Sequence, residues 1–146
     1  MNKEKRIGIA LFLALTLMLI LSWWSGLPKT AKINISISPN PVPYNSATEK
    51  WSFDVTLTEN NGIGVTLISL RYDVYDQSEE LVYTYILYEE DIIDWFESNY
   101  LPAFSSLQVS LSHTNVEKMY QIYKIAGEDD NDNPVEATGR VDFLPQ

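Results

Sequence analysis

The 146-residue chain contains no cysteine and only one histidine. Without cysteine it has no disulfide, no thiolate zinc or iron–sulfur site, no cysteine nucleophile and no lipidated N-terminal cysteine. Cations are also few, with 10 Lys and Arg against 20 Asp and Glu, so the formal net charge is −10. Because nucleic-acid binding rests on Lys and Arg contacts with phosphates, this acid excess argues against DNA or RNA as a partner.

The charge is divided unevenly along the chain. Residues 1–32 hold five cations and one acid, a local charge of +4, whereas residues 33–146 hold five cations and 19 acids, which is 5 − 19 = −14. A chain of this length allows one ordinary domain with a short appendage. The split therefore predicts that a basic N-terminal appendage precedes an acidic domain.

A continuous apolar run lies within the appendage. Ile7–Trp24 is apolar except for Gly8, Thr16 and Ser22. Its 18 residues would span about 27 Å as a helix, close to the ~30 Å hydrocarbon core of a bilayer. We therefore predict a cytoplasmic n-region at 1–6, a transmembrane helix or signal anchor at 7–25, a tether at 26–32 and a domain at 33–146.

The flanks of the run predict its orientation. Lys3, Lys5 and Arg6 should stay in the cytoplasm, which places the acidic domain outside a single-pass cell membrane protein. No clean A-x-A-like cleavage site follows the run, which favours an uncleaved anchor. The alternative is a cleaved signal peptide and a secreted domain.

The domain alternates between apolar and polar residues. Trp51, Phe53, Val55 and Leu57 point to one side of a predicted strand. Val65–Tyr75 and Leu81–Tyr88, rich in β-branched and aromatic residues, predict a hairpin. With Ile33–Ser38 and the later segments, about seven strands are expected. The fold class predicted is all-β, an immunoglobulin-like antiparallel β-sandwich with one short helix, preceded by the N-terminal transmembrane helix.

The second half of the domain contains the expected helix. In Glu90–Ser98 the apolar residues Ile92, Ile93 and Phe96 oppose acidic ones, which predicts a short amphipathic helix capping one end of the sandwich. Met119–Ile125 and Val135–Phe143 predict the last two strands. The acidic face of this helix is either a solvated surface or part of a catalytic site. The second alternative, a small hydrolase, requires two carboxylates that face each other across a cleft.

Two segments resemble a known group of domains. Trp51–Leu67 (WSFDVTLTENNGIGVTL) and Tyr120–Gly139 look like parts of the Ig-like or fibronectin-III-like domains found in prokaryotic secreted and surface-anchored proteins. The resemblance covers most of residues 33–146. It implies a surface module for adhesion, spacing, or protein or carbohydrate binding, and it transfers no catalytic residue.

The densest polar cluster is Glu128–Asn133. Several carboxylates in one loop are what a Ca²⁺ site needs, and the cluster is similar to the calcium-binding linker of cadherins, although it lies within a predicted hairpin. Asp129, Asp130 and Asp132 would be the ligands. The alternative is a plain turn, where Asp and Asn are favoured by their local hydrogen bonds.

Tyrosines gather in the predicted hairpin. Tyr83 and Tyr85 share a face with apolar leucines, which favours the core, whereas Tyr75 and Tyr88 are the candidates for exposed binding residues. No sequence pattern for catalysis is present. The sequence predicts a non-enzymatic, membrane-anchored extracytoplasmic module for protein or glycan binding or for envelope structure, without a cofactor. The alternatives are a calcium-dependent adhesive domain and a small hydrolase.

Overall fold

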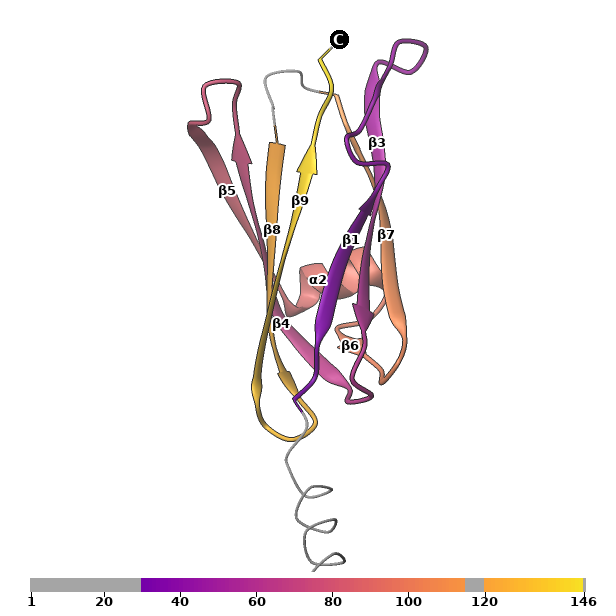
Figure 1. Cartoon of the computed structure of the whole chain (residues 1–146), viewed down its shortest axis with the longest axis vertical. Helices are drawn as coiled ribbons and strands as arrows, with labels where there is room; N and C mark the ends of the chain where they lie inside the picture. The colour runs from indigo at the N-terminus through magenta and orange to yellow at the C-terminus, as the bar shows by residue number, and fades with distance from the viewer. Residues whose placement is uncertain (1–29, 115–119, 146) are drawn as a thin grey trace, which may run out of the picture.

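The computed structural model describes residues 30–114 and 120–145, which form two β-sheets packed face to face (Figure 1). The first sheet contains β1 (Ile33–Ser38), β2 (Tyr44–Asn45), β3 (Lys50–Glu59) and β7 (Ser106–His113). The second sheet contains β4 (Val65–Tyr75), β5 (Leu81–Tyr88), β6 (Tyr100–Leu101), β8 (Tyr120–Asp129) and β9 (Pro134–Asp142). The helix α2 (Glu89–Phe96) lies between β5 and β6 in the chain.

All strand pairs within the two sheets are antiparallel. In the first sheet, β3 pairs with β1, β2 and β7; in the second, the order is β5-β4-β8-β9, with β6 paired to the start of β4. This arrangement confirms the predicted immunoglobulin-like β-sandwich with one short helix.

The core lies between the two sheets and follows the predicted alternation. The four inward residues of β3 from Trp51 to Leu57 are at most 3% exposed. They face the inward residues of the second sheet, including Leu70, Tyr123 and Ile125. The indole Nε1–H of Trp51 donates to the carbonyl of Leu144 at 2.9 Å, so the one polar atom of this ring is satisfied.

The hairpin predicted at Val65–Tyr75 and Leu81–Tyr88 has the bounds of β4 and β5. The last hairpin differs from its prediction, because β8 continues to Asp129 instead of ending at Ile125. The additional residues pair with Val65–Leu67 of β4, which shortens the loop before β9. Residue 119, where this strand was predicted to begin, lies outside the described residues.

The helix begins one residue before the predicted Glu90 and ends before Ser98, with Glu97 in the left-handed region at φ 62°. Ile92 and Phe96 are buried, but Ile93 is 41% exposed. Since residues four apart share a helix face and adjacent residues do not, Ile93 turns away from the core. The helix contacts β4, β5 and β7, and so covers the side between the two sheets instead of one end (Figure 1).

The predicted segments 1–6 and 7–25, and the tether up to residue 29, lie outside the described residues. Among the residues that the structure does describe, no helix is both long and apolar enough to cross a membrane.

Candidate binding surface

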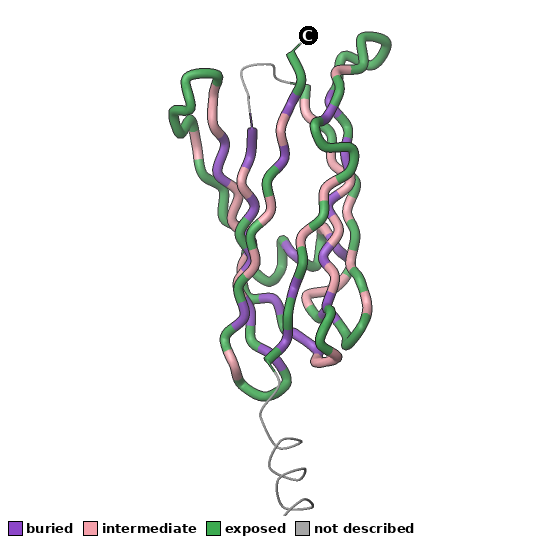
Figure 2. Tube along the Cα trace, in the orientation of Figure 1, coloured by how far each residue is buried: buried purple, intermediate pink, exposed green. Residues whose placement is uncertain are grey.

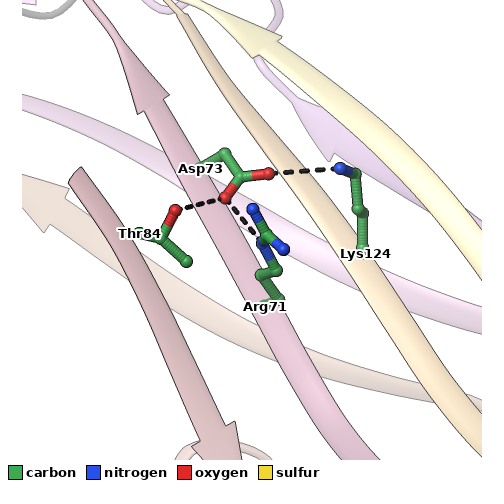
Figure 3. Close-up of polar contacts among 4 residues, drawn as sticks. All are labelled: Arg71, Asp73, Thr84 and Lys124. Atoms are coloured by element: carbon green, nitrogen blue, oxygen red, sulfur yellow. Dashed lines mark hydrogen bonds and ion pairs between the residues drawn. The ribbon is translucent and has the colours of Figure 1, made fainter. Parts of the chain in front are cut away.

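The β4–β5 hairpin carries a polar network on its outer face. Asp73 of β4 lies opposite Thr84 of β5 and one strand away from Lys124 of β8 (Figure 3). The Asp73 carboxylate accepts hydrogen bonds from Arg71 Nε at 2.7 Å, Thr84 Oγ1 at 2.7 Å and Lys124 Nζ at 3.2 Å. A single side chain therefore links β4, β5 and β8.

The environment of Asp73 keeps it ionised. Its side chain is only 1% exposed. Burial alone would raise the pKa of Asp73, but the hydrogen bonds from Thr84, Arg71 and Lys124 lower it below its usual value. A carboxylate held charged by three donors is a structural cross-link and not a proton donor near neutral pH.

An aromatic stack lies at the turn end of the same face. The rings of Tyr75 and Tyr120 stack with centroids 4.6 Å apart, and the Arg140 guanidinium lies 3.9 Å from the centroid of the Tyr120 ring. Arg140 also pairs with Asp142 at 2.7 Å. Tyr75, one of the two predicted binding residues, is therefore half-buried and packed against other side chains.

The other predicted residue, Tyr88, is 62% exposed. It pairs with Ser69 at one end of the hairpin, whereas Tyr75 pairs with Leu81 at the other. Six residues of β4 separate these positions, about 20 Å of extended chain. The structure does not bring Tyr75 and Tyr88 together into one site.

Most of β5 between these two ends is exposed and apolar (Figure 2). The exposed fractions are 51% for Leu81, 52% for Val82, 54% for Tyr85, 46% for Ile86 and 62% for Tyr88. Tyr85 stacks on Tyr72 at 5.2 Å but remains more than half exposed, although the sequence favoured a core position for it. The inward face of β5 is incompletely covered because β5 is the last strand of its sheet.

The acidic loop after β8 is built around Asp129. The Asp129 carboxylate is 3% exposed and accepts hydrogen bonds from the backbone N–H groups of Ala31, Asn131 and Asn133 at 2.9–3.0 Å. Burial would raise its pKa, but these bonds and the Asn133 side chain hold the pKa of Asp129 below its usual value. Its oxygens face backbone donors, as in an Asx-type turn.

The other two predicted calcium ligands lie in different surroundings from Asp129. Asp130 accepts a hydrogen bond from the Tyr100 hydroxyl at 3.0 Å, and Asp132 is an exposed residue in the left-handed region. Within residues 30–114 and 120–145, no group of three or more His, Asp or Glu side chains is placed to hold a metal ion. The described loop therefore has the geometry of a turn that also fastens Ala31.

A second buried carboxylate, that of Glu59, binds the backbone at the residue after Ala31. Glu59 is 1% exposed at the end of β3. Its oxygens accept five backbone N–H groups at 2.7–3.2 Å, those of Lys32, Asn61, Gly62, Ile63 and Phe104. Burial would raise the pKa of Glu59, but the bonds from these amides lower it to about 2. We call Glu59 and Asp129, with the backbone amides they accept, the tether clamp.

One hollow on the described surface can be compared with the needs of a small hydrolase. A hollow of about 210 Å³ lies on the outer face of the second sheet, lined by Arg71, Lys124 and Thr138 with one carboxylate, that of Glu136. Ligand pockets usually exceed about 300 Å³. Glycoside hydrolysis needs two carboxylates across one cleft, which this hollow does not offer. The acids of α2, Glu90 and Asp94, are exposed to solvent.

The sequence analysis did not identify Asp73 and Glu59, although the position of each residue in its strand indicates which side it faces. Glu59 continues the alternation from Trp51 to Leu57, so its position in β3 is an inward one. Arg71 and Asp73 lie two apart on one strand and so share a face. The third partner, Lys124, is 51 residues away and has no local signal.

Comparisons with known proteins agree with this architecture. No protein-family model matches the sequence, and no curated protein matches it significantly. The crystal structure of the putative ApaA protein from Bordetella pertussis aligns with 82% of this chain and 100% of its own, with 12% identity and a TM-score of 0.54. This likeness shows the fold alone.

Two further solved structures are less similar. The CARDB domain of PF1109 from Pyrococcus furiosus, in complex with di-metal ions, covers 82% of this chain and 99% of its own, at 12% identity and TM-score 0.44. AggA, the major subunit of aggregative adherence fimbriae type I from Escherichia coli, covers 82% and 98%, at 10% identity and TM-score 0.45. The immunoglobulin-like β-sandwich is therefore assigned from the pairing within the two sheets, and the surface of the domain must indicate its role.

Proposed function

We propose that the chain is a non-enzymatic surface module, held in the cell membrane by residues 7–25, whose acidic domain binds a protein or glycan outside the cell. The observation that carries this proposal is the exposed apolar strand β5, in which five large side chains are 46–62% exposed. A domain with a charge of 5 − 19 = −14 is otherwise well solvated, so such a strand points to an interaction site.

The β4–β5 hairpin favours a protein over a glycan. Sugars stack on flat, accessible rings. The stack at the turn end of the hairpin does not offer one, because Tyr120 is only 8% exposed and contacts Tyr75 and Arg140. The exposed rings of the hairpin are those of Tyr85 and Tyr88, which lie among aliphatic side chains of β5. The exposed strand combines the aliphatic Leu81, Val82 and Ile86 with two tyrosines. The buried core of a protein interface is apolar and enriched in aromatic residues, which matches this composition. The Asp73 network holds this strand in place before any partner arrives.

Membrane topology can be tested cleanly because the chain has no cysteine of its own. Ser46→Cys introduces a thiol at an exposed position of the domain, and Asn2→Cys introduces one before the apolar run. A membrane-impermeant maleimide should label Ser46→Cys on intact cells and Asn2→Cys only after lysis. Labelling of Ser46→Cys only after lysis would contradict the proposal.

The same cells test the retention of the anchor and the capture of a partner. Mass spectrometry of the mature chain should find residues 7–25 still attached, and alkaline extraction should leave the protein in the membrane. A photo-crosslinking residue at Ile86 should capture a discrete partner, whereas one at the exposed Thr138, on the opposite edge strand, should capture none. Release of a shortened, soluble chain would favour a secreted domain instead.

A further inference from the structure

The strand β5 lies at an edge of the second sheet as far as the structure describes it. It pairs with Ser69–Tyr75 of β4 on one side, and within the described residues no strand pairs with its other side. Leu81–Tyr88 contains no charge and no proline, the two devices that commonly protect an edge. Within the described residues, the N–H and C=O groups on this side of Thr84–Tyr88 have no strand partner and are available to an added strand.

The other edge strand on the same side of the sandwich is better protected. In β7 the outward residues are Ser106, Gln108, Ser110 and Ser112. In β5 the outward residues are Val82, Thr84, Ile86 and Tyr88, of which three are apolar. A strand added to β5 would find apolar neighbours beside its own side chains as well as backbone partners.

Acidic residues stand at both ends of β5 and disfavour a second copy of this chain. In a fully overlapping antiparallel pair, Leu81 would lie opposite Tyr88. This brings Glu79 and Glu80 of one copy close to the start of α2 in the other, where Glu89 and Glu90 follow β5 directly. A parallel pair in register would place each of these acids beside its own copy. Like charges opposite one another destabilise a strand pair. A strand with cations at both ends has the complementary charge.

We propose that β5 accepts an extended strand of a partner protein, about eight residues with alternating apolar side chains and Lys or Arg at both ends. The added strand hydrogen-bonds to the free edge of β5, and its terminal cations pair with Glu79, Glu80, Glu89 and Glu90. Thr84, bonded to the buried Asp73 at 2.7 Å, fixes the middle of β5 for this docking. This inference rests on the proposed binding function and names the class of its partner.

Three labelled peptides test the proposal on the full chain in lipid nanodiscs. The first has eight alternating Val and Thr residues with two lysines at each end. The second has glutamates in place of the lysines, and the third keeps the lysines but has proline at two central positions. Fluorescence anisotropy should show the first peptide binding at least about tenfold tighter than either other peptide. Equal binding of the proline peptide would overturn strand addition, because proline cannot join the ladder.

Charge variants locate the binding. Glu79→Lys/Glu80→Lys should weaken binding of the lysine-ended peptide by about tenfold and strengthen that of the glutamate-ended one. The matched control is Glu49→Lys/Glu128→Lys, which changes the net charge equally at exposed positions away from β5. An equal loss in the control would mean that the peptide senses only the overall charge, and would overturn the proposal.

Hydrogen exchange gives a readout independent of affinity. The lysine-ended peptide should slow amide exchange within residues 81–88 and leave β7 unchanged. Protection confined to another strand, or self-association through β5 without peptide binding, would overturn the inference. The proposed function and the strand-addition proposal can fail independently. If Ser46→Cys is not labelled from outside the cell, the proposed function is wrong whatever the peptides show. If the residue at Ile86 captures a partner that does not add a strand to β5, the proposed function is supported and strand addition is wrong.

Discussion

The second sheet has two edge strands, β9 and β5, which differ in how far other parts of the domain cover them. The edge formed by β9 is covered by β1 of the other sheet. Gly139 lets the two strands approach at Ile35, and the Asn40 side chain bonds to the backbone of both Arg140 and Asp142 at 2.8–2.9 Å. The β5 edge has no comparable cover among the described residues. We call the β9 edge, which β1 covers, the closed edge. On the opposite side α2 covers the gap between the sheets, but within the described residues no strand pairs with the outer edge of β5, which we call the open edge.

The closed edge is also fixed at its start. Ala31 and Lys32, which lead into β1, donate their backbone N–H groups to Asp129 and Glu59 at 2.9 and 3.1 Å. The clamp thus joins the beginning of β1 to the loops of both sheets. If residues 7–25 anchor the chain, this edge bears the load from the membrane, whereas β5 is free to meet a partner.

The largest expected effect comes from breaking the tether clamp. Glu59→Gln replaces an oxygen that accepts backbone N–H groups with an amide that donates, and so leaves buried donors unpaired. We expect a loss of about 2–4 kcal/mol in the free energy of unfolding, because hydrogen bonds to charged groups contribute more than neutral ones. Urea denaturation measures it. Glu80→Gln, at the exposed start of β5, should change stability by less than about 0.5 kcal/mol; similar losses in both variants would refute the clamp.

The same clamp predicts a loss of stability in acid. In the folded protein, hydrogen bonds from backbone N–H groups lower the pKa of Glu59 from its usual 4.5 to about 2, and such bonds also lower the pKa of Asp129. Both carboxyl groups therefore bind a proton less readily in the folded protein than in the unfolded chain, so both contribute less to stability as the pH falls. The stabilisation from Glu59 is present above pH 4.5 and is lost as the pH falls toward 2. The thermal midpoint should drop across this window. Glu59→Gln should show a shallower drop, and an unchanged pH profile in that variant would contradict the assignment.

Adding a side chain at the close contact between β1 and β9 should reduce the free energy of unfolding by a smaller amount. A Cβ added at Gly139 would lie 2.6 Å from Cγ2 and 2.9 Å from Cβ of Ile35, so one strand must shift. We expect Gly139→Ala to cost about 1–3 kcal/mol, the usual range for overpacking. Thr138→Ala, at an exposed position next to it, should be nearly neutral in the same denaturation assay. A neutral Gly139→Ala would mean that the edge is loosely packed.

The sequence predicts the bounds and faces of the strands better than it predicts which strands lie at an edge. The bounds of β4 and β5 follow from long runs of strand-forming residues, and the inward face of β3 follows from strict alternation. Alternation also places Tyr85 inward, but it cannot say that β5 is the last strand of its sheet, which leaves Tyr85 54% exposed. Whether a strand lies at an edge depends on pairing between distant segments, which local patterns do not encode.

The acidic loop teaches a related point. A row of acids and amides predicts either a calcium site or a turn, because both need oxygen atoms close together. The choice depends on what else approaches the loop. In the structure the buried Asp129 receives the N–H of Ala31, 98 residues away in the chain. The sequence gives the composition of the loop but not the segment that docks on it.

The smallest effect on stability is expected from a substitution at the open edge, in β5. Such a variant can lose peptide binding while its stability stays the same. Val82 is 52% exposed in β5, so Val82→Lys should change the free energy of unfolding by no more than about 0.5 kcal/mol. A lysine on an edge strand disfavours the addition of another strand. This variant should therefore melt like the parent chain yet bind the lysine-ended peptide more weakly. Unchanged binding would show that the partner does not approach along this edge.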